Sequence, residues 1–115
     1  MKKRFLLFPI AAGIFAITAP AEVLTITEFP VPTAASQPYS IALGPDGNLW
    51  FTETGTNKIG RVTPTGGFTE FSIPTPGSQP HAITTGPDGN LWFTEAGAGK
   101  IGRVNLSSVA LRGSQ

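Results

Sequence analysis

The sequence repeats itself at an offset of 42 residues, and this repeat restricts the possible folds more than any other feature. SQPYSIALGPDGNLWFTETGTNKIGRV at 36–62 and SQPHAITTGPDGNLWFTEAGAGKIGRV at 78–104 are identical at 20 of 27 positions. The match extends upstream, because ITEFPVPTAASQP at 26–38 aligns with FTEFSIPTPGSQP at 68–80. A period of about 40–45 residues is typical of one four-stranded blade of a β-propeller.

The segments within one period have the features of antiparallel strands. The string GPDGN places Asp-Gly between two apolar runs, which is typical of a hairpin turn. NLWFTE then alternates, with Leu49 and Phe51 on one face and Trp50 on the other. The 11 prolines and 14 glycines fall mostly between these segments and leave no window for a helix of about ten residues after residue 21. We therefore predict an all-β fold of two consecutive four-stranded antiparallel propeller blades over residues 22–105.

Two blades do not close into a ring, because propellers usually have about four to eight blades. From Leu106 the repeat stops, so that residues 106–115 form a non-repeat tail. An unclosed pair of blades leaves an apolar face and an unpaired strand edge in water. Two explanations follow. Either the gene is shortened from a longer propeller, which we favour, or the chain is a small protomer that completes a ring with copies of itself.

Residues 1–21 have the layout of a secretory signal peptide. A basic start at Lys2, Lys3 and Arg4 precedes an apolar run, and the small residues around Ala19 and Ala21 form a cleavage site. The run is short for a membrane span of about 20 residues. We expect cleavage after Ala21, a secreted or periplasmic location, and no membrane association after cleavage.

The charge balance changes once the signal is removed. Five basic and seven acidic residues remain, giving a net charge of about −2 in place of the +1 of the full chain. Nothing in this balance predicts a nucleic-acid partner. The chain has no cysteine, so packing alone must hold it together in an oxidising compartment.

The repeated strings resemble the blades of the streptogramin B lyases, also called virginiamycin B lyases. GPDGNLWFTE, NKIGRV and TPTGGFTEFSIPTPGSQPHAI carry the resemblance, which covers residues 26–105. It implies a seven-bladed propeller, of which this chain has about two blades. It also implies a carbon–oxygen elimination that opens the ester of a cyclic depsipeptide antibiotic, so a small peptide-like ligand is expected. Such a reaction needs a base, and Mg²⁺ is the electrophile that the resemblance implies.

The resemblance points to three residues at the starts of two strands. His81 in QPHAI matches a family histidine and is the candidate base. Tyr39 in QPYSI stands at the same place one period earlier and is a second catalytic candidate. Gln79 is a candidate for substrate binding, at a position where the family has a glutamate. The chain has a single histidine and no recognisable metal-ligand spacing, so Mg²⁺ is implied by the resemblance only.

Comparing the two copies separates scaffold from candidate site. Identical residues are interpreted as structural: Trp50 and Trp92 as packing between blades, and Glu95 as the partner of an arginine or of backbone amides. Three differences between the copies, at 54/96, 56/98 and 57/99, fall in a turn and are interpreted as drift. The alternative to a lyase is a non-enzymatic propeller module that serves as a scaffold, binds a ligand or takes part in assembly. The lack of a second histidine favours this alternative.

Overall fold

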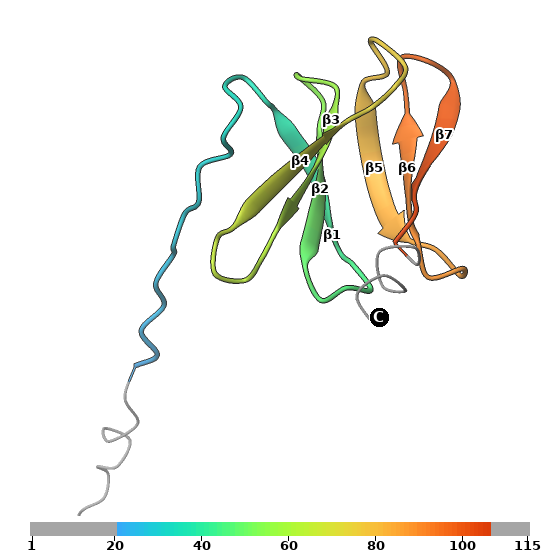
Figure 1. The fold of residues 1–115 in the computed structure, drawn as a ribbon. Helices are drawn as coiled ribbons and strands as arrows, with labels where there is room; N and C mark the ends of the chain where they lie inside the picture. Colours follow the sequence, from blue (N-terminus) through green and yellow to red (C-terminus); the bar gives the residue numbers. More distant parts are fainter. Residues whose placement is uncertain (1–20, 107–115) are drawn as a thin grey trace, which may run out of the picture.

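The computed structural model describes residues 21–106, which form seven strands in two antiparallel sheets (Figure 1). The first blade has the order β1-β2-β3-β4 and the second has β5-β6-β7. Their bounds are β1 Pro38–Leu43, β2 Leu49–Glu53, β3 Lys58–Val62, β4 Phe68–Ser72, β5 Pro80–Thr85, β6 Leu91–Glu95 and β7 Lys100–Val104. The described residues contain no helix, and hence none that could cross a membrane.

The prediction of two consecutive antiparallel blades is confirmed, with two differences in strand count. Residues 26–32 have the sequence of a fourth strand, but they run as an extended, unpaired segment that leaves the sheets (Figure 1). The physical reason is that bonds of residues 33–37 hold the base of this segment on the first blade, whose four strands are already in place, and so keep it away from β7, the edge strand of the second sheet among the described residues. The second blade has three strands within the described residues. The predicted non-repeat tail, residues 106–115, follows β7, and all of it except Leu106 lies, like residues 1–20, outside the described part.

The predicted Asp-Gly hairpin joins β1 to β2, and it does more than reverse the chain. Gly44 N donates to Asn48 O at 2.8 Å, and Gly47 takes a φ of 81°, which favours glycine. The Asp46 carboxylate accepts from Asn48 N at 3.2 Å and from Trp50 Nε1 at 3.0 Å. The second blade repeats these bonds, with 2.8 Å from Trp92 Nε1 to Asp88 Oδ1. The PDGNLW string is therefore a turn that also fixes a tryptophan ring.

The main core lies between the two blades. Trp50 and Ile59 from the first blade pack with Ile83, Leu91 and Phe93 from the second. Trp50 is 1% exposed, which confirms the interpretation that this tryptophan packs between blades. Its equivalent Trp92 lies on the outer face of the second blade and is only partly buried.

The differences between the two copies in the turn after β2 were interpreted as drift, but the structure gives these side chains specific contacts. Asn57 Nδ2 donates to Ile73 O and Thr75 O, and Asn57 Oδ1 accepts from Ser78 N at 3.0 Å and from Ser78 Oγ. Thr54 Oγ1 donates to Pro80 O at 2.6 Å. These side chains fasten the first blade to the linker and to the start of β5. Alanine or glycine in the second copy cannot make such bonds.

Candidate functional site

The candidate site lies where β1 and β5, the first strands of the two blades, run side by side. Each strand has a bulge near its start, because the register with the next strand shifts between Pro38 and Ile41 and again between Pro80 and Ile83. Bulges redirect side chains and are frequent beside functional sites. Tyr39 lies within the first shift and His81 within the second.

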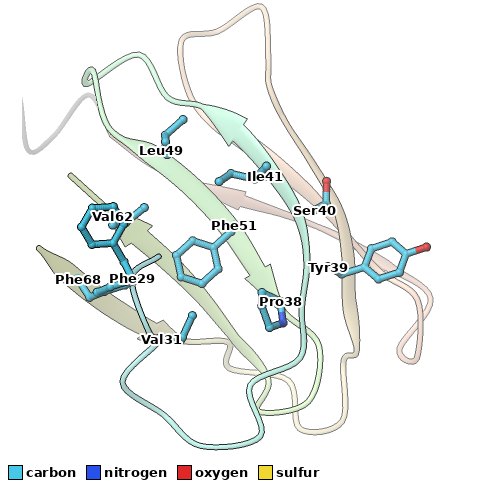
Figure 2. A pocket seen from close by; sticks show the side chains of 10 residues that line it. All are labelled: Phe29, Val31, Pro38, Tyr39, Ser40, Ile41, Leu49, Phe51, Val62 and Phe68. Atoms are coloured by element: carbon cyan, nitrogen blue, oxygen red, sulfur yellow. The ribbon is translucent and has the colours of Figure 1, made fainter. Parts of the chain in front are cut away.

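The structure brings Tyr39 and His81 together. Their rings stack with centroids 3.8 Å apart and planes inclined by 27°. Both side chains are exposed, and Tyr39 is 63% exposed although it is a large aromatic residue. Figure 2 shows the Tyr39 ring pointing away from the apolar groove that its backbone borders. An imidazole on an exposed aromatic ring can reach a ligand in solvent and accept a proton from it.

A buried threonine holds these two strand starts in place. Thr52 Oγ1 donates to His81 O at 2.8 Å and accepts from Ser40 N at 3.1 Å. One hydroxyl therefore links the bulge of the first blade to that of the second. Because Thr52 is fully buried, the spacing between the Tyr39 and His81 backbones is set by the interior of the molecule.

Gln79 stands next to this pair, but its contacts are within its own blade. Its φ of 50° is in the left-handed region, as is the φ of 49° at the equivalent Gln37. Gln79 O accepts from Ala96 N at 3.2 Å, and the side chain lies against Gly97, where a Cβ would meet Gln79 Cγ at 3.0 Å. The residue is exposed, so its side-chain amide can still reach solvent near His81.

A larger apolar groove of about 400 Å³ lies on the outer face of the first blade (Figure 2). Its lining includes Ile41, Leu49 and Phe51. The equivalents of these three residues at the 42-residue offset are Ile83, Leu91 and Phe93, which form the core between the blades. The groove is therefore a packing face that no other blade among residues 21–106 covers, and it differs in character from a polar reaction site.

Sequence reasoning missed a carboxylate pair inside the first blade. The Glu53 side chain is fully buried and accepts from Thr56 Oγ1 at 3.0 Å. Glu70 accepts from Thr33 Oγ1 at 2.7 Å and lies 3.8 Å from Lys58 Nζ. Glu53 opposes Lys58 on β3, and Gly60 opposes Glu70 on β4. The strand registers could have indicated this pair, because they place both acids on the same face of the sheet as Lys58.

The two carboxyl groups titrate as a pair. Burial, together with the neighbouring Glu70 carboxyl, raises the pKa of Glu53 to about 7. The bond from Thr33 lowers the pKa of Glu70, and the attraction of Lys58 acts in the same direction. Because its pKa is about 7, Glu53 keeps its proton in the folded chain at pH values below about 7.

The equivalent acid of the second blade, Glu95, has different surroundings. Within residues 21–106 no arginine forms an ion pair with it, because Arg103 is held by Asp88 at 3.3 Å and Arg61 lies beside Asp46 at 3.9 Å. The Glu95 backbone carbonyl accepts from Ala98 N and Gly99 N in the turn that follows β6. The prediction that an arginine pairs with Glu95 is therefore wrong for the described part of the chain.

Comparison with known proteins places these blades in a family. The sequence profile of the Virginiamycin B lyase family matches residues 16–111, which is most of the chain. The chain belongs to the virginiamycin B lyase family. Curated virginiamycin B lyases from Bacillus licheniformis and from Bordetella pertussis are each 49% identical to it, over 43 and 41 residues. These matches span 15% and 14% of the relatives' lengths, so the chain corresponds to a small part of each.

Solved structures of virginiamycin B lyases share the fold. The Staphylococcus aureus enzyme aligns with a TM-score of 0.69 at 57% identity, over 72% of this chain and 28% of that one. A catalytically inactive histidine-to-alanine variant of the S. aureus enzyme, with quinupristin, aligns with a TM-score of 0.68 at 58% identity. A streptogramin B lyase structure aligns with a TM-score of 0.67 at 52% identity. The fold and family predicted from the repeat are confirmed.

The residues around His81 do not fit the Mg²⁺ that the family resemblance implies. They offer an imidazole, a phenol and an amide, whereas Mg²⁺ prefers carboxylate oxygens and water. Within residues 21–106, no three histidine, aspartate or glutamate side chains gather where they could hold a metal ion. We therefore assign no step of a reaction to Mg²⁺ in this chain.

Proposed function

We propose that this chain is an exported virginiamycin B lyase-like propeller unit whose ligand face is the paired start of β1 and β5. The stacking of His81 on Tyr39 is the observation that supports this proposal. It joins the one histidine and the one tyrosine of the chain on an exposed surface. Export rests on the signal-like residues 1–21, and it implies a secreted or periplasmic location.

In this proposal, His81 accepts the α-proton of a cyclic depsipeptide while the ester carboxylate leaves from the β-carbon. The electron pair of the broken C–H bond forms the new carbon–carbon double bond, and the leaving ester oxygen keeps the pair of the broken C–O bond. Tyr39 orients the imidazole by stacking on it, and the fixed backbone at Thr52 keeps both rings in place. Gln79 lies two residues before His81 and is exposed, so its amide can contact the ligand.

The proposed site is incomplete as a catalyst. A second histidine is missing from the sequence, and Gln79 supplies no carboxylate. General acid–base assistance typically contributes about 10²–10⁴-fold, so a base without its partner acid loses much of that factor. We therefore propose weak activity or none for the chain alone. The alternative is a non-enzymatic scaffold or ligand-binding module. The buried, apolar contacts between the blades favour the scaffold role.

The test is the loss of a cyclic streptogramin B, followed by mass spectrometry, with the full chain and Mg²⁺ present. We expect no linear product or a barely detectable amount. Any product should disappear in His81→Ala. Thr65→Ala, at an exposed position in the turn between β3 and β4, is the control and should leave the result unchanged. Rapid turnover that survives His81→Ala would show that the reactive residues lie elsewhere.

A further inference from the structure

Among residues 21–106, the segment before the first blade has no strand partner, and the last strand of the second blade is paired on one side only. Residues 26–30 are extended, and Ile26 is 88% exposed despite its apolar side chain. At the other end, β7 pairs only with β6 among the described residues. Ile101 on β7 is 65% exposed, whereas its equivalent Ile59 on β3 is 2% exposed. An open strand edge and a free strand-forming segment are the two parts of a β-augmentation.

The repeat assigns the free segment to the fourth-strand position. Residues 26–29 read ITEF, and residues 68–71, one period later, read FTEF within β4. β4 pairs antiparallel with β3 and then leads through residues 73–79 into β5 of the following blade. Residues 26–30 lead through residues 31–37 into β1 in the same way. The free segment therefore has the sequence and the connection of an outer strand that belongs to a preceding blade.

The connection at 31–37 already sits on the first blade as 73–79 sits on the second. Thr54 N donates to Gln37 O at 3.2 Å, as Ala96 N does to Gln79 O at 3.2 Å. The contacts of the two threonines also repeat, with Lys58 Nζ 3.0 Å from Thr33 Oγ1 and Lys100 Nζ 3.1 Å from Thr75 Oγ1. Unlike β4, residues 26–30 are not paired with a sheet.

We propose that residues 26–30 of one copy add to β7 of a second copy as the fourth strand of its second blade. The β3–β4 register, moved by one period, places Ile26 opposite Val104, Thr27 opposite Arg103 and Phe29 opposite Ile101. The outer face of the first copy's first blade then covers the outer face of the second copy's second blade. The segment cannot serve its own β7 without leaving the first blade, because the bonds of residues 33–37 hold its base there.

The proposed contact would repeat an aromatic contact that the first blade already contains. Phe71 stacks on Trp50 with centroids 5.6 Å apart, and Arg61 lies 5.5 Å from the Trp50 ring. Over the equivalent Trp92, Arg103 lies at 5.4 Å, but no aromatic ring among residues 21–106 takes the place that Phe71 has over Trp50. Phe29 of another copy would fill that place.

Phe29 has a less complete contact in the single chain. It borders the apolar groove of its own first blade (Figure 2), near Gly66, and remains 44% exposed. In the proposed contact Phe29 turns from this groove to Trp92 of the second copy. The groove, with Phe51, then faces the apolar hollow at Trp92, Thr94 and Ile101 of that copy.

The proposed contact also brings opposite charges together. Glu70 lies 3.8 Å from Lys58, and its equivalent Glu28 would lie near Lys100 of the second copy. Such a head-to-tail contact is heterologous, so copies add until a ring closes. The described residues of each copy form two blades, and propellers have about four to eight, so three or four copies are expected in a closed ring.

Single cysteines test this contact because the chain has none of its own. Full chains carrying Thr27→Cys are mixed with differently tagged full chains carrying Arg103→Cys, and the mixture is oxidised. Facing residues of antiparallel strands lie about 4.5–5.5 Å apart at Cα, within the range of a disulfide. We expect a mixed disulfide dimer on a non-reducing gel, at least about tenfold more abundant than with Lys100→Cys, which lies on the opposite face of β7. Thr69→Cys with Arg61→Cys in one chain is the geometric control, since those residues are partners within the first blade.

The oligomeric state of the unmodified chain provides an independent readout. Sedimentation equilibrium at micromolar concentration should give one discrete species of three or four copies. Phe29→Ser should shift that species to smaller mass while circular dichroism keeps the strand signal. A folded monomer of the unmodified chain, or equal cross-linking at positions 100 and 103, would overturn the proposal.

Discussion

Asn57→Gly should destabilise the chain by about 2–4 kcal/mol, although it only copies the residue that the second blade has at the same place. The substitution removes four hydrogen bonds to the linker and leaves the Ser78 amide and hydroxyl without their acceptor. Ser78 is fully buried, and an unsatisfied buried polar group costs about 1–3 kcal/mol. Chemical denaturation followed by tryptophan fluorescence measures the change.

Gly99→Asn is the matched control. Gly99 has a φ of 66°, close to the 61° of Asn57, so the backbone at both positions accepts asparagine. A Cβ at Gly99 meets nothing within 4 Å. We expect a change within about 0.5 kcal/mol, as for most surface substitutions. Equal effects of the two exchanges would mean that the linker bonds of Asn57 contribute little.

Glu53→Gln should raise the stability of the chain at pH 8 by about 1–3 kcal/mol. The pKa of Glu53 is about 7 in the folded chain and 4.5 in its ordinary state, so the folded chain binds the extra proton between these values. Stability that depends on this proton is fully present below pH 4.5 and is lost as pH rises through 7. Glutamine keeps the shape of the protonated acid and carries no charge to bury.

Thermal melting between pH 4.5 and pH 8 gives the test. The unmodified chain should lose stability across this interval, and Glu53→Gln should lose much less. Glu22→Gln, at an exposed residue, controls for the change in net charge. The lower limit of pH 4.5 keeps Asp88 ionised throughout, because bonds from Trp92 and Asn90 lower its pKa to about 2. A pH dependence that Glu53→Gln leaves unchanged would show that Glu53 does not hold the extra proton.

The fold could be predicted because the repeat states each element twice. Alternation in NLWFTE, the Asp-Gly turns and the 42-residue period are local signals, and they indicated the strands and their order. The fate of residues 26–30 was less accessible, since a segment with strand sequence forms a strand only where a sheet edge is available. The same sequence pattern, ITEF or FTEF, is therefore paired at 68–71 and unpaired at 26–29.

Part of the candidate site could be reached from the sequence. The exchange of Tyr39 for His81 between two otherwise similar copies indicated a special position, and the structure brings both rings into contact. The roles of Thr54, Thr56 and Asn57 were misread because turn differences look neutral in a sequence. Only the contacts that the fold creates show what these side chains do. The Glu53–Glu70 pair was missed for a similar reason, since it forms across strands that are 17 residues apart in the sequence.

We expect a ligand to bind at the stacked Tyr39 and His81 rings, and proton NMR tests this binding directly. The chain has one histidine and one tyrosine, so their ring signals identify themselves. The His81 ring protons should be shifted by the stacked Tyr39 ring and should move towards ordinary values in Tyr39→Ala. A streptogramin B should shift the His81 and Tyr39 signals together in a saturable way. Saturable binding that moves the Trp92 indole signal and leaves His81 unchanged would contradict this expectation, as would no binding at all.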